Sequence, residues 1–152
     1  MQIACRQWAN WSSAFEGKGV EPMEFFTLPE DGAHPFPFCH SVASDDLIFI
    51  AGQIACDEPG WSGPAGDIEA ETRMAMDRIG RILKAAGAGF EHIVRVGIFM
   101  TDLDAFDRMN TVYRGYFAPP RFPARTCVGV ASLLGGSMIE IDCVARLPRK
   151  PA

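Results

Sequence analysis

No apolar run in this sequence reaches the roughly 18 residues that a membrane-spanning helix needs. The N-terminus also lacks the apolar core of a secretory signal peptide, because Arg6, Asn10 and Ser12 interrupt that stretch. The five cysteines are scattered and include no CxxC pair, which is typical of reduced thiols rather than of a disulfide framework. Together, these absences predict a cytoplasmic protein without a membrane segment.

Sequence motifs for metals, nucleotides and acyl transfer are missing as well. The three histidines, His34, His40 and His92, form no HxxxH or HExxH pattern, so no metal site is expected. There is no Walker A loop, no GxGxxG after a strand and no Gly-x-Ser-x-Gly, so we expect neither a bound nucleotide nor a hydrolase elbow. A net charge of −5 and a pI of about 5.1 argue against nucleic-acid binding through a basic surface.

The length of 152 residues suits a single domain, with 48% hydrophobic and 22% charged residues. We expect an N-terminal extension over residues 1–22 and one domain over residues 23–152. Within the extension, Trp8, Trp11 and Phe15 have the spacing of a short amphipathic helix, before a stretch with Gly and Pro breaks the pattern.

Strand-like and helix-like patterns alternate along the domain. Apolar, β-branched runs predict strands over 39–42, 47–54, 93–100, 126–131 and 138–145, with room for one short extra strand before the first helix. Helical spacing predicts one helix from the N-cap Asp67 to Gly87, with Arg73, Arg78, Arg81 and Lys84 at its later positions. A second helix is expected from Asp102 or Asp104 to Pro119, with an inner face of Leu103, Phe106, Met109, Tyr113 and Phe117.

This order, β-β-α-β-α-β-β, defines an α+β fold with a mixed sheet of about six strands and two helices on one face. The other face also carries apolar residues and is expected to need a partner, most economically in a closed homo-oligomer. Gly52 lies inside an apolar strand, which indicates a β-bulge or a close approach of the backbone to another group.

Two charged side chains interrupt otherwise apolar strands. Arg125 begins a strand and, by alternation, shares a face with Cys127, while Glu140 lies between two isoleucines in the last strand. Burying a guanidinium and a carboxylate in neighbouring apolar strands costs desolvation free energy, unless the two groups pair with each other or bind a ligand. From position alone, two interpretations are equally good. One is a structural Arg125–Glu140 ion pair, and the other is a pocket in which Arg125 binds a substrate carboxylate and Glu140 positions or deprotonates a water molecule. From position alone, Asn110 is better interpreted as a solvated or locally hydrogen-bonded amide, and Cys127 as a small core residue.

Several blocks of sequence follow one another between about Phe36 and Arg146. They are 51–54 (AGQI), 66–72 (GDIEAET), 82–88 (ILKAAGA), 104–113 (DAFDRMNTVY), 122–128 (FPARTCV) and 139–141 (IEI). This ordered series resembles the RidA family, also called YjgF/YER057c/UK114, and is far more specific than any one block.

The resemblance implies a chorismate-mutase-like subunit that forms a homotrimer with clefts between subunits and needs no cofactor. Members of the family hydrolyse imines and enamines of 2-keto acids, such as 2-aminoacrylate, to the keto acid and ammonia. The family's carboxylate-binding arginine falls on Arg125 and its water-positioning glutamate on Glu140. Its other substrate-binding positions fall on Phe38, Ala51, Gly52, Asn110 and Cys127. Phe38 replaces a tyrosine and Ala51 a serine of the best-known members, so the pocket loses two hydroxyls and becomes more apolar.

Two alternatives to an imine deaminase stay open. The loss of both hydroxyls suits a carboxylate-binding, regulatory trimer with little or no catalysis. A ribonuclease, a label attached to some members of the family, is disfavoured by the acidic charge and by the lack of a histidine pair or basic groove.

Overall fold

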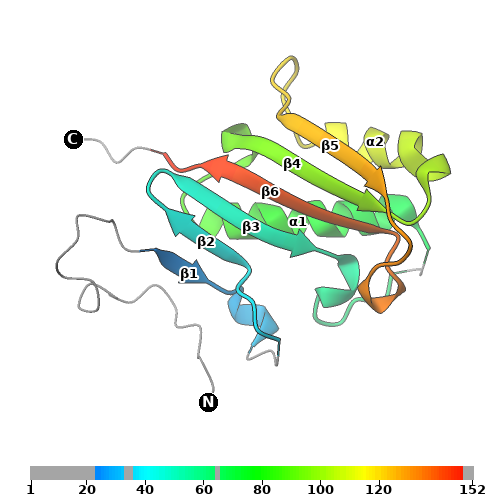
Figure 1. Ribbon diagram of the computed structural model, residues 1–152, viewed down its shortest axis with the longest axis horizontal. Helices are drawn as coiled ribbons and strands as arrows, with labels where there is room; N and C mark the ends of the chain where they lie inside the picture. The colour runs from blue at the N-terminus through cyan, green and yellow to red at the C-terminus, as the bar shows by residue number, and fades with distance from the viewer. Residues whose placement is uncertain (1–22, 33–35, 64–65, 149–152) are drawn as a thin grey trace.

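The computed structural model describes residues 23–32, 36–63 and 66–148 (Figure 1). The expected extension over residues 1–22, with its amphipathic helix, lies outside the described residues. No helix in the described part of the chain combines the length and the apolar character that crossing a membrane requires.

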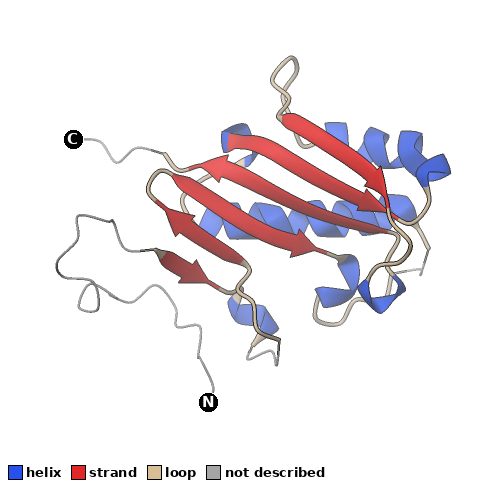
Figure 2. Cartoon of the chain, viewed as in Figure 1, coloured by secondary structure: helices blue, strands red, loops and turns tan. Residues whose placement is uncertain are grey.

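Six strands form one mixed sheet in the order β1-β2-β3-β6-β4-β5 (Figure 2). The strands are β1 (Glu24–Phe26), β2 (Ser41–Ser44), β3 (Leu47–Gln53), β4 (Ile93–Met100), β5 (Ala124–Gly129) and β6 (Ile139–Arg146). All neighbouring strands are antiparallel except β4 and β5, which are parallel. The helices α1 (Ile68–Ala85) and α2 (Phe106–Arg114) lie on the same face of the sheet. The predicted α+β class is confirmed, and the short β1 supplies the sixth strand.

Helix α1 begins where the sequence predicts. The Asp67 carboxylate accepts hydrogen bonds from the backbone N–H groups of Glu69 at 3.0 Å and Ala70 at 3.2 Å, which satisfies donors that have no partner inside the helix. Gly87 follows the helix with a φ of 72°, in the left-handed region that favours glycine. One face of α1 is fully buried, including Ile68, Ala75, Ile79, Ile82 and Leu83.

Helix α2 is shorter than the predicted second helix. Asp102 caps the 3-10 turn η4 (Leu103–Ala105) through the Asp104 N–H at 2.9 Å, and the α-helix itself starts at Phe106. Leu103, expected on the inner face, is 51% exposed, because the tighter turn places it out of register with the helix that follows. Phe117 lies beyond the end of α2 but is buried, with its ring 4.9 Å from that of Tyr113.

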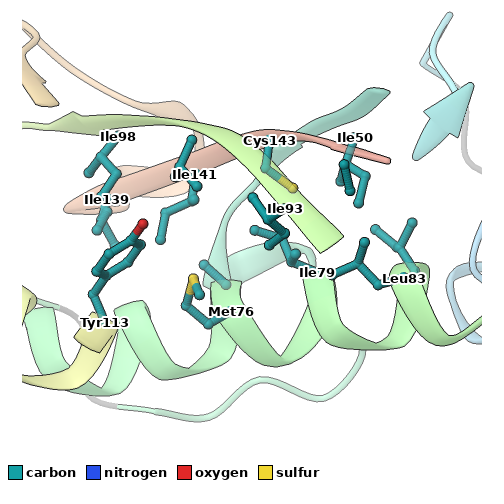
Figure 3. Close-up of a cluster of buried hydrophobic side chains, with 14 of the residues drawn as sticks. Ile50, Met76, Ile79, Leu83, Ile93, Ile98, Tyr113, Ile139, Ile141 and Cys143 are labelled. Carbon is teal, nitrogen blue, oxygen red and sulfur yellow. The ribbon is translucent and has the colours of Figure 1, made fainter. Parts of the chain in front are cut away.

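Side chains of the sheet alternate between a buried face and an uncovered one. In β6, Ile139, Ile141, Cys143 and Ala145 are buried against the helices, and Figure 3 shows the first three above α1. On the opposite face, a row of paired residues crosses four strands. Its members are Phe25, Val42, Phe49 and Val144. Phe25 and Phe49 are 45% and 47% exposed, so this face is an apolar surface of the kind that proteins cover with a partner.

Replacing Asp67 with alanine removes the acceptor for two N–H groups at the start of α1. We expect the free energy of unfolding to fall by about 1 kcal/mol, as is usual for the loss of an N-cap. Chemical denaturation followed by circular dichroism measures this change. Asp67→Asn is the matched control, since it keeps a capping oxygen without the charge, and it should retain most of the stability. Equal losses in both variants would assign the effect to charge instead.

Candidate functional site

Arg125 extends from β5 toward the helices, because it pairs in register with Val96, whose side chain is buried on that face. One guanidinium nitrogen, Nη1, donates a hydrogen bond to Asn110 Oδ1 at 2.7 Å. The guanidinium carbon lies 4.8 Å from the centre of the Tyr113 ring and 5.5 Å from that of Phe106. Burial raises the pKa of Tyr113 to about 12, so this ring is neutral near neutral pH and serves as a π face for the cation.

The half-buried Arg125 has no carboxylate partner among the described residues. It opens onto a cleft of about 340 Å³, which is lined by Asn110, Tyr113, Arg114, Phe122, Pro123 and Arg125. The lining thus contains two arginines and no acid. A planar guanidinium fork that is fixed by an amide and two rings can bind a carboxylate through two parallel hydrogen bonds.

Cys127 follows on the same face of β5, as the alternation predicts. Its Sγ lies 3.7 Å from the sulfur of Met100. Burial raises the pKa of the Cys127 thiol, and the nearby Arg125 offsets this only in part. The thiol is therefore protonated near neutral pH, which suits a residue that lines a pocket and not a nucleophile.

Glu140 lies on the other face of the sheet. Its neighbours Ile139 and Ile141 are fully buried toward the helices, so the intervening carboxylate points to the uncovered face. Burial raises the pKa of Glu140, and the like charges of Asp142 and Asp57 raise it further. A carboxylate with a raised pKa is a better proton acceptor at neutral pH than an ordinary glutamate.

Gly52 lies directly against Glu140. The pairing of β3 with β6 shifts register between Ile50 and Gln53, so a bulge interrupts the strand at this point. A Cβ atom at position 52 would overlap the Glu140 carboxylate. The sequence predicted a bulge or a close approach at Gly52, and the structure shows both.

The segment before β2 meets the same end of β3. The Ala51 N–H donates a hydrogen bond to the His40 carbonyl at 2.9 Å. The Phe38 ring, which is 38% exposed, packs edge-on against the His40 ring with centroids 5.6 Å apart. Phe38 and Ala51 therefore adjoin the strand end where Gly52 contacts Glu140.

The predicted site residues thus fall into two groups on opposite faces of the sheet. The Arg125 group contains Arg125, Asn110 and Cys127, and the Glu140 group contains Glu140, Gly52 and Ala51. The expectation that Arg125 and Glu140 occupy neighbouring strands was wrong, and so was the ion pair within one chain. The reason is that β6 inserts between β3 and β4, which leaves β4 between the two charged residues.

Two residues of the Arg125 environment were assigned only to the core by the sequence. Phe106 and Tyr113 hold the guanidinium between their rings, as described above. Their spacing could have identified them, because they lie four residues before and three residues after Asn110 on one helix face. Within the ranges that the structure describes, no group of His, Cys, Asp and Glu side chains is arranged to hold a metal ion.

Comparisons with known proteins identify relatives of this chain. A family model described as endoribonuclease L-PSP matches residues 33–147. The human 2-iminobutanoate/2-iminopropanoate deaminase is 38% identical over 109 residues, which cover 72% of this chain and 79% of that protein. A RutC family protein of Synechocystis is 36% identical over 113 residues, which cover 74% of this chain and 87% of that protein.

Solved structures show the same fold. The crystal structure of the YjgF gene product of E. coli has a TM-score of 0.73 and 30% identity, and covers 81% of this chain and 98% of that one. The structure of the yeast protein YEO7 has a TM-score of 0.75 and 28% identity, and covers 84% of this chain and 100% of that one. The chain belongs to the YjgF/RidA family, which the endoribonuclease L-PSP model represents.

The raised pKa of Glu140 predicts how stability changes with pH. An acid whose pKa is higher in the folded state stabilises the fold at low pH, and this contribution is lost as pH rises through the folded pKa. Glu140→Gln removes the charged form, so we expect the variant to gain stability over the wild type at pH 7. The gain should shrink as the pH falls from neutral through the raised folded pKa of Glu140, and should be absent below about 4, where glutamates are protonated in both states.

Urea denaturation at several pH values measures this difference. Glu24→Gln, at an exposed position of β1, is the control for removal of one negative charge. A stability difference for Glu140→Gln that does not vary with pH would contradict the assigned environment of Glu140.

Proposed function

We propose that this protein hydrolyses imines and enamines of 2-keto acids to the keto acid and ammonia. The observation that carries the proposal is Arg125, a half-buried guanidinium held by Asn110 and two rings in a cleft without an acid. Such a group is ready for a small carboxylate, and every 2-imino acid has one. The deaminase relatives, which are 36–38% identical over most of their length, support the same reaction class.

The reaction needs placement of a water more than a strong nucleophile, since the carbon of a protonated imine is already electrophilic. Water adds to the C=N carbon, and its proton passes to Glu140 as the C–O bond forms. The resulting carbinolamine loses ammonia when the C–N bond breaks, with the Glu140 proton delivered to the departing nitrogen. The C=O bond of the keto acid forms as the hydroxyl gives its proton to Glu140, which passes it to the released ammonia, so that the products are the keto acid and an ammonium ion. Arg125 holds the carboxylate throughout.

Arg125 and Glu140 lie on opposite faces of the sheet, so within one chain they do not face the same substrate. In the proposed assembly, a homotrimer, the Arg125 group of one copy meets the Glu140 group of another. The apolar row that includes Phe25 and Phe49 supports association of copies through the uncovered face. In a closed ring of three subunits, the same contact repeats at every subunit interface, so each interface would form one complete site.

A carboxylate-binding trimer without catalysis is the second candidate. It is favoured by Phe38 and Ala51, which bring no hydroxyl to the strand end beside Glu140. An endoribonuclease, the activity named in the description of the family model, has less support. The chain carries a net charge of −5, and the cleft at Arg125 contains no histidine.

A coupled assay that generates 2-iminopropanoate in situ tests the proposed reaction. We expect the wild type to accelerate ammonia release and Arg125→Ala to lower kcat/KM about a hundredfold, since a bidentate charged contact is lost. Arg121→Ala is the control, because that arginine does not line the Arg125 cleft but a second cleft beyond the shared residues Phe122 and Pro123, and its activity should match the wild type. Unchanged turnover in Arg125→Ala would exclude the anchor. If the wild type binds a keto acid and Arg125→Ala does not, but the wild type releases no ammonia, the regulatory alternative would be favoured.

Mixed assemblies test whether two copies share each site. Arg125→Ala and Glu140→Gln should each retain only on the order of a hundredth of the wild-type activity when assayed alone. The two variants are then mixed in equal amounts, unfolded together and refolded. The mixture should regain about a quarter of the wild-type sites, because one subunit interface in four combines an intact Arg125 with an intact Glu140. Activity of refolded mixtures, normalised to protein concentration, gives this fraction. A mixture as inactive as its components would show that both residues must come from one chain.

A further inference from the structure

Arg78 is a cation with no solvent exposure in the middle of α1. Its guanidinium contacts three side chains that lie 20 or more residues before it in the sequence. Nη2 donates to Asp31 Oδ2 at 2.5 Å, Nη1 donates to Glu58 Oε2 at 3.0 Å, and Nε donates to Gln53 Oε1 at 3.0 Å. The two carboxylates compensate the buried charge, as burial of a guanidinium requires.

The third contact does not compensate charge, because Gln53 is neutral. This amide is also fully buried, and its Nε2 donates to the carbonyls of Ala51 at 3.0 Å and Gly52 at 3.2 Å. Gln53 therefore connects Arg78 to the backbone of the bulge in β3. A buried amide with partners on both of its ends has a fixed orientation.

The bulge is the part of the backbone that lies against Glu140. Since no Cβ fits between Gly52 and the Glu140 carboxylate, a small movement of the Gly52 peptide also moves this carboxylate or frees it. Arg78, Gln53, Gly52 and Glu140 thus form a continuous series of contacts from the buried side of the sheet to its uncovered side.

The same guanidinium restrains the segment that carries Phe38. Asp31, which pairs with Arg78, also lies 2.9 Å from His40 Nε2. The other ring nitrogen of His40, Nδ1, accepts the Leu28 N–H at 3.0 Å, so the ring is fixed on both sides. The Phe38 ring packs edge-on against this ring.

We propose that Arg78 and Gln53 are positioning residues that hold the Gly52 bulge, and through it Glu140, in the geometry needed for attack by water. This inference rests on the proposed imine hydrolysis. Misplacing a catalytic group by about 1 Å can lower the rate of the reaction up to about a hundredfold. The series of contacts from Arg78 through Gln53 and Gly52 to Glu140, here called the relay, should therefore affect kcat directly. Arg125 holds the substrate from another part of the fold, so substrate binding should depend little on the relay.

Gln53→Met tests the relay, since methionine has a similar shape and no charge but neither donor nor acceptor of an amide. We expect kcat to fall about tenfold with KM changed less than about twofold. Arg78→Lys keeps a charge for Asp31 or Glu58 but has no Nε donor for Gln53, so it should give a similar loss. If the two residues act as one relay, the double variant should lose no more than either single variant.

Ile79→Val is the matched control, because it loosens the packing of the neighbouring buried residue of α1 without touching the relay. Its kcat should equal that of the wild type. Additive losses in the double variant, or an equal loss in Ile79→Val, would overturn the positioning role and leave only a role in stability.

Carbon-13 NMR titration of Glu140 supplies a readout that does not depend on turnover. A loosened bulge admits water to the carboxylate, so its pKa should fall toward the ordinary value in Gln53→Met and in Arg78→Lys, but not in Ile79→Val. An unchanged pKa in both folded relay variants would overturn the inference. Absence of turnover in the wild type would instead refute the proposed function, and the titration would still decide whether the relay positions Glu140.

Discussion

The one-sided cover of the sheet is the constraint on which the rest of this structure depends. Both helices pack on one face, so each strand buries every second side chain and presents the others to the uncovered face. Residues on the covered face are fixed by the core, whereas those on the other face take their final surroundings from whatever binds there. Arg125 belongs to the first set and Glu140 to the second. A reaction that uses both must therefore bring a covered face and an uncovered face together.

Arg78 and Arg125 show how surroundings decide what a guanidinium does. Arg78 has no exposure and two carboxylate partners, Asp31 and Glu58, so its charge is satisfied inside the fold. Arg125 is held by an amide oxygen and two aromatic faces, which orient the cation without neutralising it. The first arrangement fixes the backbone around it. The second leaves a charged fork available to an anion from outside.

Local features of this fold could be read from the sequence, and pairings between distant segments could not. The Asp67 cap, the limits of β4 and the bulge at Gly52 follow from neighbouring residues, and the structure has them where they were predicted. The place of β6 depends on which strand edge is free after the helices pack, so its insertion between β3 and β4 was not foreseen. The burial of Arg78 was missed as well, although it lies three residues after Ala75 and four before Ile82, on the buried side of α1. The candidate site residues were suggested by family blocks, while their division between the two faces of the sheet required the structure.

The central position of β6 has a consequence for synthesis of the chain. Ile139–Arg146 is synthesised after the other strands of this sheet, yet it pairs with β3 on one side and β4 on the other. Until it arrives, the two halves of the sheet have open edges, and the buried faces of α1 lack the isoleucines of β6. A chain interrupted before Ile139 would therefore contain the other five strands and both helices but lack the central strand that packs between them. Quality control in the cell would recognise such a product by its exposed apolar surface, and slow completion of the last segment would prolong the time during which nascent chains can aggregate.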